Sequence, residues 1–298
     1  MTGFEKKLEK VPVNQRERLK FIEFRLYWEE AVNRKAITGY FQISDPQASL
    51  DLKLYQELCP GSLDYDLSGR CYRPSKTFKP RLTNPSAKEY LDCLLNPEHE
   101  NHDAKLGNIP LAERVPTFGR PVSPEIIRVL TEAMQREHQV KIKYHSPRSP
   151  EATNRVIAPL ALVYTLERWH VRSFCFLRDD FRSFVLGRML DISAAGEPQK
   201  AVPLDKNWEA RVEVVIKPSK QLEQGATAII EQEYDMSDGQ AKRKVRIAQL
   251  QYFLHENCLL DSTTAEPSGR ENIRPDNGQI RIENLEEVKA ALSQERGQ

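Results

Sequence analysis

Basic and aromatic side chains alternate along one apolar stretch of the chain, residues 155–192. Its β-branched and aromatic composition, interrupted by short polar turns, predicts three consecutive strands at residues 156–163, 169–177 and 182–187. Because successive side chains of a strand point to opposite faces, His170 and Arg172 share a face that otherwise holds phenylalanines. Arg182 and Arg188 share a face for the same reason. Guanidinium groups bind phosphate through paired hydrogen bonds and rings stack on bases, so the pattern suits a ligand that carries both.

A second interpretation of the same arginines needs no ligand. Four acidic residues lie within or beside the predicted strands and turns: Glu167, Asp179, Asp180 and Asp191. Arginines on a solvated sheet commonly pair with carboxylates of this kind. The alternation of side chains alone does not decide between an ion-paired surface and a phosphate site.

Two short segments of this stretch carry a likeness to a known family. Residues 168–172 read RWHVR and residues 184–188 read FVLGR. The stretch resembles the WYL domain, a small Sm-like β-barrel of bacterial regulators, with Trp169-His170-Val171 at the tripeptide that names the domain. Both segments are similar to those of WYL regulators encoded beside phage-defence operons of the BREX and CBASS types. The resemblance implies one concave ligand-binding face formed by Tyr144, Ser146, His170, Arg172, Arg182 and Arg188.

Length and charge limit the classes of protein to which the chain can belong. With 298 residues it is long enough for two or three domains, and a net charge of +1 gives no overall attraction for polyanions. Residues 1–82, however, hold 15 basic against 11 acidic side chains, whereas residues 207–298 hold 12 against 16. A polyanionic partner is therefore expected at the N-terminal end.

Cysteines, histidines and apolar runs exclude several other classes. The five cysteines form no CxxC pair, which argues for reduced thiols in the cytoplasm and against a zinc ribbon or a disulfide framework. No apolar run approaches 18 residues, so a cytoplasmic protein is expected, neither secreted nor bound to a membrane. His99 and His102 lack a second ligand set, so a solvated loop is expected there rather than a metal site. No catalytic motif is present, and no cofactor is expected.

Three helices are expected near the N-terminus. Apolar residues recur at helical spacing over residues 14–32, and a short helix is expected at residues 37–43. Ser44 with Gln47 three residues later is typical of a capped helix start, and Cys59-Pro60-Gly61 ends that helix. One side of this third helix is apolar and is expected to be buried: Ala48, Leu50, Leu52, Leu54, Tyr55 and Leu58.

A β-hairpin is expected next, at residues 63–67 and 70–73, and residues 70–81 contain five basic side chains and no acidic one. This order is typical of a winged helix-turn-helix domain, whose third helix enters the major groove while the wing contacts phosphates. The expected DNA contacts are Ser44, Gln47, Ser49, Lys53, Gln56, Arg70, Arg73 and Lys76. Residues 46–51, PQASLD, also resemble the defence-associated regulators. A helical protein-interaction module of the same shape is the alternative.

The expected fold class is multidomain α+β. Residues 1–82 form the winged helix-turn-helix, 83–120 a connector with one short helix at 86–96, 121–206 the Sm-like WYL barrel, and 207–298 a small α+β unit. In the last segment predicted strands and helices alternate, ending in a helix at residues 285–292. The resemblance implies that this C-terminal unit forms a homodimer with a second copy.

We therefore expect a homodimeric transcription regulator and not an enzyme: a repressor of a phage-defence operon that binds an inverted-repeat operator in double-stranded DNA. Its WYL domain would bind a nucleotide, an oligonucleotide or single-stranded nucleic acid as effector. Two other functions remain open. One is an adaptor that binds single-stranded nucleic acid through the barrel, for which Arg172 would matter more than Lys53. The other is a phosphodiesterase centred on His170, which would turn over oligonucleotides.

Overall fold

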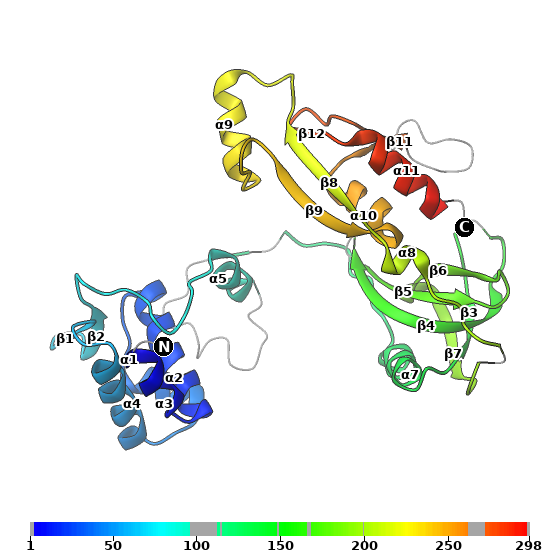
Figure 1. Ribbon diagram of the computed structural model, residues 1–298. Helices are drawn as coiled ribbons and strands as arrows, with labels where there is room; N and C mark the ends of the chain where they lie inside the picture. Colours follow the sequence, from blue (N-terminus) through cyan, green and yellow to red (C-terminus); the bar gives the residue numbers. More distant parts are fainter. Residues whose placement is uncertain are drawn as a thin grey trace. The chain divides into compact units, whose positions relative to one another are not determined.

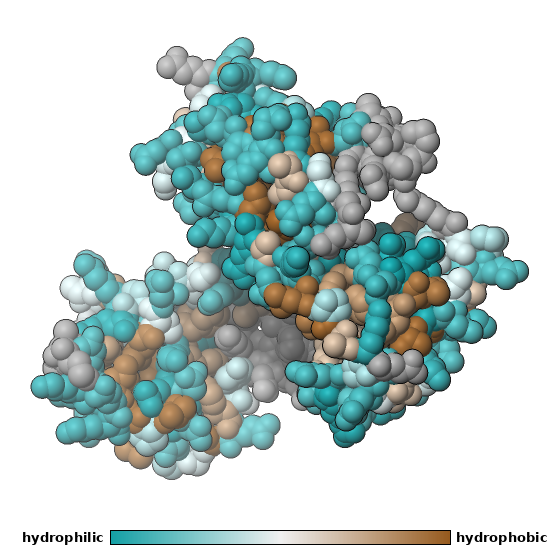
Figure 2. Space-filling model, turned by 45° about the vertical axis from the view of Figure 1, so that its right-hand side comes forward, coloured by the Kyte–Doolittle hydropathy of each residue, from teal (hydrophilic) through white to brown (hydrophobic). Residues whose placement is uncertain are grey.

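The chain divides into two compact units, residues 1–117 and residues 118–298 (Figure 1). The structure is a computed structural model that describes residues 3–95, 112–113, 115–147, 149–165, 168–198, 200–261 and 272–296. The expected loop with His99 and His102, and the turn residues Leu166 and Glu167, lie outside the described residues. Hydrophilic side chains cover most of the face shown in Figure 2, in line with a mean hydropathy of −0.61.

The first unit is a small helical domain with a two-stranded wing. Its elements are α1 (Gly3–Glu9), α2 (Val13–Glu29), α3 (Arg34–Phe41), α4 (Asp45–Leu58), β1 (Leu63–Asp66), β2 (Cys71–Pro74) and α5 (Ala87–Leu94). The three predicted helices, the hairpin and the connector helix are confirmed, whereas the sequence pattern does not predict α1. One apolar cluster, which includes Leu19, Ile22 and Tyr55, holds α2, α3 and α4 together.

The start of α4 is capped as the sequence predicts, but its buried side differs. The Ser44 hydroxyl accepts a hydrogen bond from the backbone N–H of Gln47 at 3.4 Å. Leu50, predicted to be buried, is 58% exposed, and Asp51 is fully buried instead. The physical reason is an ion pair: Arg18 of α2 neutralises Asp51, so a carboxylate takes a place in the buried stripe of the helix.

The wing is joined to the helices through its second strand. Tyr65 of β1 lies opposite Tyr72 of β2, and their rings pack edge to face. The backbone of Val32, between α2 and α3, exchanges hydrogen bonds of 2.9 and 2.8 Å with Tyr72. At the tip, Asp66 accepts hydrogen bonds from two backbone N–H groups of the turn. The base of the wing is therefore fixed to the helical core.

The chain that leaves the wing is held against α2. Glu23 of α2 is fully buried and accepts hydrogen bonds of 2.7–2.9 Å from the backbone N–H groups of residues 81–83. Further along, Tyr90 of α5 stacks on Trp28 of α2, with ring centroids 4.4 Å apart. α5 therefore packs on the helical domain.

The second unit begins with a helix and a five-stranded antiparallel sheet. The elements are α7 (Pro124–Gln135), β3 (Val140–Tyr144), β4 (Thr153–Thr165), β5 (Arg168–Cys175), β6 (Asp180–Val185) and β7 (Met189–Ala194). The strand order is β6-β5-β4-β3-β7. α7 covers one face over a core that includes Leu130, Ile157 and Val171. Within the described part of the chain the edge strands β6 and β7 do not pair, so closure into a barrel stays a prediction.

The register of the sheet corrects part of the predicted ligand face. Directly opposite residues of antiparallel strands lie on the same face, and Arg182 lies opposite Ser173. Ser173 follows Arg172 and points to the other face, so Arg182 and Arg172 are on different faces of the sheet. A short 3-10 helix at Leu186–Arg188 also interrupts the strand, so alternation does not relate Arg182 to Arg188. The single face predicted for these arginines is wrong.

The C-terminal part of the second unit is a small α+β layer. Its elements are α8 (Lys206–Glu209), β8 (Arg211–Pro218), α9 (Gln224–Glu233), β9 (Ala241–Arg246), α10 (Leu250–Glu256), β10 (Leu260–Asp261), β11 (Asn272–Ile273), β12 (Ile280–Ile282) and α11 (Leu285–Arg296). β12, β8 and β9 form a sheet in that order. Leu250, Leu254 and Val288 lie in its core. The predicted alternation of strands and helices is confirmed, including the last helix.

Candidate nucleic-acid interface and anion site

The outer side of α4 carries four of the predicted DNA contacts: Gln47 and Ser49, which are half-buried, and Lys53 and Gln56, which are exposed. The Ser49 hydroxyl donates to the carbonyl of Asp45 at 2.9 Å, and Ser44 is engaged as the helix cap. The structure adds Leu50, which the sequence pattern assigned to the core. An exposed apolar side chain on this helix can contact the methyl group of a thymine.

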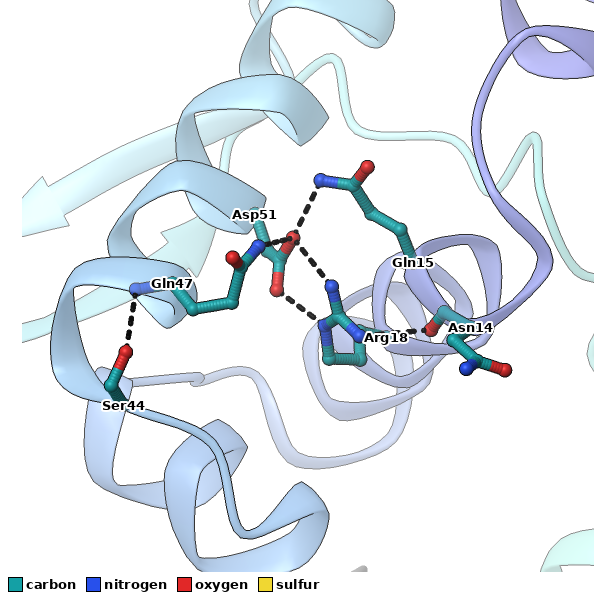
Figure 3. Close-up of polar contacts among 6 residues, drawn as sticks. All are labelled: Asn14, Gln15, Arg18, Ser44, Gln47 and Asp51. Atoms are coloured by element: carbon teal, nitrogen blue, oxygen red, sulfur yellow. Dashed lines mark hydrogen bonds and ion pairs between the residues drawn. The ribbon is translucent and has the colours of Figure 1, made fainter.

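A buried carboxylate holds Gln47 in place (Figure 3). Nε2 of Gln47 donates to Oδ1 of Asp51 at 3.2 Å, within the same helix. Nε of Arg18 donates to Oδ2 of Asp51 at 2.5 Å, and Nε2 of Gln15 donates to Oδ1 at 2.8 Å. Both of these donors come from α2, so the network joins the two helices and gives the buried carboxylate a counter-charge.

The cations of the wing differ in whether they have an acidic partner. Nε of Arg73 donates to Asp66 at 2.9 Å. Hydrogen bonds from Ser68, from the next backbone N–H and from Arg73 hold the pKa of Asp66 well below its usual range. Arg70 and Lys76 are exposed, and neither pairs with a carboxylate among the residues that the structure describes. Arg70 and Lys76 are therefore better placed than Arg73 to contact phosphates.

Arg172 forms a buried ion pair. Its Nε and Nη2 donate to the two oxygens of Asp205 at 2.8 and 3.2 Å, and both residues are buried. Its guanidinium carbon also lies 5.7 Å from the centroid of the Phe181 ring. Asp205 in turn caps α8 by accepting the backbone N–H of Trp208 at 3.1 Å. Arg172 therefore ties β5 to the C-terminal layer and does not lie on an open ligand face as predicted.

His170 lies on the same strand as Arg172, two residues earlier, but its surroundings differ. Its Nδ1 lies 3.4 Å from the hydroxyl of Tyr252 on α10. Its Nε2 is buried and has no hydrogen-bond partner among the described residues. Burial, together with the positive charges of Arg168 and Arg188, lowers the pKa of His170 to about 4. The imidazole is therefore neutral near pH 7.

Positive charge gathers around this histidine, and the described residues supply no counter-ion to Arg168 or Arg188. Burial and the charges of Arg120 and Arg188 lower the pKa of Arg168. Nε of Arg168 is buried without a hydrogen-bond partner, and no ion pair of Arg168 or Arg188 occurs within the described part of the chain. Unsatisfied buried donors call for an acceptor, and repelling cations favour an anion. We refer to Arg168, His170 and Arg188 as the anion site.

The remaining predicted ligand residues have different places. The hydroxyl of Tyr144 accepts the backbone N–H of Val185, which lies opposite His170 in the sheet, so Tyr144 lies beside the anion site. Arg182 is 47% exposed and lies 3.5 Å from Asp180. Ser146 is half-buried in the turn after β3. The structure thus brings together three of the six predicted residues: Tyr144, His170 and Arg188.

Sequence reasoning missed Arg168 and Tyr252. Arg168 precedes His170 by two residues, so the alternation that linked His170 with Arg172 also places Arg168 on that face. That signal was present in the RWHVR segment. Tyr252 is separated from His170 by 82 residues, and no local pattern relates the two.

Three family models match the chain in succession. The winged helix-turn-helix domain of the BrxR transcriptional regulator matches residues 14–96, the WYL domain matches residues 125–194, and the C-terminal dimerization domain of BrxR matches residues 211–288. The DNA-binding transcriptional repressor CapW of Escherichia coli (strain KTE188) is 31% identical over 94% of this chain and 92% of its own length. The protein of the same name from Pseudomonas aeruginosa is 33% identical over 92% and 91%. The chain belongs to the BrxR/CapW family of transcriptional regulators.

Membership of the BrxR/CapW family confirms the likeness inferred from the RWHVR and PQASLD segments. A further CapW, from Stenotrophomonas maltophilia, is 30% identical over 96% of this chain and 95% of its own. The family consists of regulators, which agrees with the expectation that the chain is not an enzyme and speaks against a phosphodiesterase centred on His170. No helix within the described residues is long and apolar enough to cross a membrane.

One solved structure gives a weaker likeness to this BrxR/CapW-family chain. Proteasome accessory factor B/C (PafBC) of Arthrobacter aurescens is 20% identical and aligns with a TM-score of 0.24. The match covers 94% of this chain and 48% of that protein, so the chain spans about half the length of PafBC. A TM-score of this size does not establish a shared arrangement.

Proposed function

We propose that the chain is a DNA-binding transcription repressor that recognises an inverted-repeat operator through α4 and the wing. The observation that carries the proposal is the outer side of α4, where Gln47, Leu50 and Lys53 stand on a capped helix of a winged domain. Amide and ammonium groups read base edges or phosphates, and exposed wing cations add phosphate contacts. The CapW relatives are named DNA-binding transcriptional repressors, which supports the same role here. The resemblance to regulators beside phage-defence operons supports such an operon as target and the cytoplasm as place of action.

Operator binding is tested with the DNA upstream of the gene. Lys53→Ala combined with Lys76→Ala removes two exposed cations and is expected to weaken operator binding. The variant is also expected to release about two fewer counterions on binding, so that its affinity depends less steeply on salt concentration. Lys88→Ala on α5, where the side chain pairs with Asp92, is the matched control and is expected to bind like the wild type. Fluorescence anisotropy at several salt concentrations measures both. Equal affinity of the double variant and the wild type would contradict the proposal, and stronger binding of the separated strands would favour the single-strand adaptor.

We propose further that two copies assemble through the C-terminal layer. An inverted repeat has two half-sites related by two-fold symmetry, so its reader is expected to share that symmetry. The matching BrxR model is described as a dimerization domain, and the acidic balance of residues 207–298 suits a protein contact better than a DNA contact. Light scattering after size exclusion is expected to give twice the chain mass of 34.4 kDa. A monomer that binds both half-sites at the same concentration would contradict this assembly.

The third part of the proposal is an effector that carries phosphate: a nucleotide, an oligonucleotide or single-stranded nucleic acid. We propose that one phosphate binds at the anion site, on a sheet that corresponds to the Sm-like barrel of the WYL family. Two buried nitrogens, Nε of Arg168 and Nε2 of His170, lack hydrogen-bond partners among the described residues. An anion held by these groups gains charge-assisted hydrogen bonds in a partly desolvated place. Effector binding can alter operator affinity only by favouring one arrangement of the winged domains over another.

The effector is tested by operator binding in the presence of short oligonucleotides with and without a terminal phosphate. A change in operator affinity is expected with the phosphorylated strand, and a smaller one without the phosphate. Inorganic phosphate, which carries the anion but no base, distinguishes occupancy of the anion site from recognition of the rest of the ligand. Unchanged operator affinity with every compound would contradict the effector proposal and leave the operator proposal intact.

A further inference from the structure

Asp51 occupies a place on α4 where an apolar side chain is expected. Its neighbours along the buried stripe are Ala48, Leu52 and Tyr55, all of which lie in the core of the winged domain. A leucine at this position would pack there without any partner. A carboxylate instead needs a cation and several donors before it can be buried. The chain supplies these groups from α2, as Arg18 and Gln15.

The fourth bond of this carboxylate goes to a side chain of the DNA-facing side. Besides two bonds from Arg18 and one from Gln15, Asp51 accepts the side-chain N–H of Gln47 at 3.2 Å. Gln47 lies one helical turn before Asp51, in the first turn of α4. In recognition helices of helix-turn-helix domains, the N-terminal residues are the ones that reach base edges. The buried network therefore ends on the residue best placed to read a base.

We infer that Asp51 is a positioning residue for DNA recognition: it fixes the amide of Gln47 so that Gln47 reads an A·T base pair. The inference rests on the proposed operator binding through α4. Its basis is the chemistry of the contact. A carboxylate only accepts hydrogen bonds, so the amide of Gln47 must turn its nitrogen toward Asp51. Figure 3 shows the amide oxygen of Gln47 pointing away from Asp51.

The fixed amide presents one donor and one acceptor in a set order. One N–H of the Gln47 nitrogen is bound to Asp51, which leaves the second N–H beside the amide oxygen. This pair matches adenine in the major groove, where N7 accepts and the N6 amino group donates. A glutamine that is free to turn can offer its donor and acceptor in either order and therefore discriminates less. Asp51 thus adds selectivity, and it also places the side chain before DNA binds.

Arg18 makes the arrangement compatible with DNA. A bare carboxylate beside Gln47 would repel the phosphate backbone, but Arg18 donates to both oxygens of Asp51 and balances its charge. The ion pair lies mostly out of solvent, with 13% of the Arg18 side chain and none of Asp51 exposed, so salt screens it little. The positioning of Gln47 is therefore expected to persist over the salt range in which phosphate contacts weaken.

The experiment measures binding of the full-length protein to an operator series in which every base pair of a half-site is replaced in turn. For the wild type, replacing one A·T pair near the N-terminus of α4 is expected to weaken binding about 5- to 100-fold. Gln47→Ala is expected to lose this preference at that position and at no other. Asp51→Asn, which has one acceptor oxygen where the wild type has two, is expected to lose the preference at the same position. Combining the two substitutions is expected to change the preference no further.

A merely structural role of Asp51 predicts a different pattern. Asp51→Asn would then weaken binding to every operator by the same factor and retain the wild-type preference, and this result would overturn the inference. Asp45→Asn is the matched control, because it removes a negative charge from the same helix at an exposed position away from the network. It is expected to retain the preference at every base pair. Loss of the preference in this control would also overturn the inference.

A second variant covers the case in which Asp51→Asn does not fold. Arg18→Met combined with Asp51→Leu replaces the ion pair by apolar side chains of similar size, a change that folded proteins often tolerate. It leaves Gln47 without its acceptor and is expected to lose the same base preference. If Gln47→Ala retains every preference while Lys53→Ala with Lys76→Ala weakens binding, the inference fails and operator binding stands. If neither changes binding, operator binding through α4 fails as well.

Discussion

Arg172 lies on strand β5 beside two residues of the anion site, Arg168 and His170, and differs from them in having a carboxylate partner. At Arg172 the guanidinium is buried against the carboxylate of Asp205, with hydrogen bonds of 2.8 and 3.2 Å. At the anion site, Arg168 and His170 lie four and two positions earlier on the same face, and each buries a nitrogen that has no hydrogen-bond partner among the described residues. Arg168 and Arg172 are arginines on the same face of β5, and Arg172 is the more deeply buried of the two. Of the two, only Arg172 has a counter-charge among the described residues.

This difference separates a structural cation from one available to a ligand. The charge of Arg172 has its acceptor within the chain, so the unbound protein already gains the energy of that pair. Arg168 and Arg188 instead repel one another, and burial together with these two charges lowers the pKa of His170 to about 4. Such repulsion destabilises the unbound state and is relieved when an anion binds. The same strand therefore provides a fixed joint to the C-terminal layer and a site that is incomplete without a ligand.

The largest effect is expected when the buried ion pair of Arg172 and Asp205 is broken. Arg172→Ala leaves Asp205 buried without its partner and is expected to lower the free energy of unfolding by about 3–5 kcal/mol. Urea titration followed by circular dichroism measures it. Arg172→Met combined with Asp205→Leu removes both charges and is expected to recover most of the loss. If Arg172→Ala keeps full stability and loses only the effector response, the comparison between Arg172 and the anion site is wrong.

The second prediction uses pH to probe the incomplete site. In the unfolded chain a histidine titrates near pH 6.5, whereas His170 titrates at about 4 in the folded protein. Between these values the unfolded chain binds a proton that the folded chain does not. The free energy of unfolding is therefore expected to fall as the pH is lowered from about 6.5 to about 4, by at most about 3 kcal/mol. Above pH 6.5 this histidine contributes no pH dependence.

His170→Gln isolates this contribution from that of other groups. The difference in unfolding free energy between the variant and the wild type is expected to depend on pH only inside that window. Saturating phosphate is expected to raise the pKa of His170 and so to reduce the loss of stability at low pH. A pH dependence that is the same in the variant and the wild type would show that His170 is not held neutral by its surroundings.

The third prediction compares two arginines that the sequence pattern treated as equivalent. Arg188→Ala is expected to weaken phosphate binding about 10- to 100-fold, because it removes a charge-assisted hydrogen bond of about 1.5–3 kcal/mol. Arg182→Ala is the matched control, since Arg182 is exposed beside Asp180 on the other face of the sheet. It is expected to bind phosphate like the wild type. Isothermal titration calorimetry measures both, and equal losses in the two variants would place the anion elsewhere.

Local patterns predicted most of the fold. Apolar spacing and capping signals are short-range, so they located α2, α3 and α4, the hairpin and most strands of the two larger sheets, but not β7 or β12. The pattern failed at Leu50, which is exposed, and it did not indicate that Asp51 of the same helix is buried. Arg18, which pairs with Asp51, lies 33 residues earlier in the chain. Whether a charged residue can be buried depends on its partner, and a partner distant in the sequence cannot be found from a local pattern.

The candidate ligand residues show the same limit. Alternation within β5 correctly placed His170 and Arg172 on one face, because that relation lies within one strand. It could not show that Asp205 forms an ion pair with Arg172. Nor could it show that β6 pairs with β5 in a register that puts Arg182 on the other face of the sheet. Both facts depend on contacts between separate elements. Of the residues predicted by resemblance, Tyr144, His170 and Arg188 therefore gather at the anion site, whereas the ion pair of Arg172 and the strand register of Arg182 keep these two away from it.

The smallest effect is expected on the wing, because Arg73 of β2 is paired with a carboxylate whereas Lys53 of α4 forms no ion pair among the described residues. Asp66 already lies 2.9 Å from Arg73, and its pKa is held well below the usual range, so the pair stays ionised at neutral pH. An exposed pair of this kind contributes about 0–1 kcal/mol, and its arginine offers a phosphate only part of its charge. Arg73→Ala is expected to weaken operator binding at most about threefold, less than Lys53→Ala does.

Asp66→Asn keeps an acceptor for the turn but removes the charge that pairs with Arg73. It is expected to tighten operator binding slightly and to release about one more counterion on binding, so that the affinity depends more steeply on salt concentration. Anisotropy titrations at two salt concentrations check both, and a larger loss for Arg73→Ala than for Lys53→Ala would show that pairing does not decide which cations contact DNA.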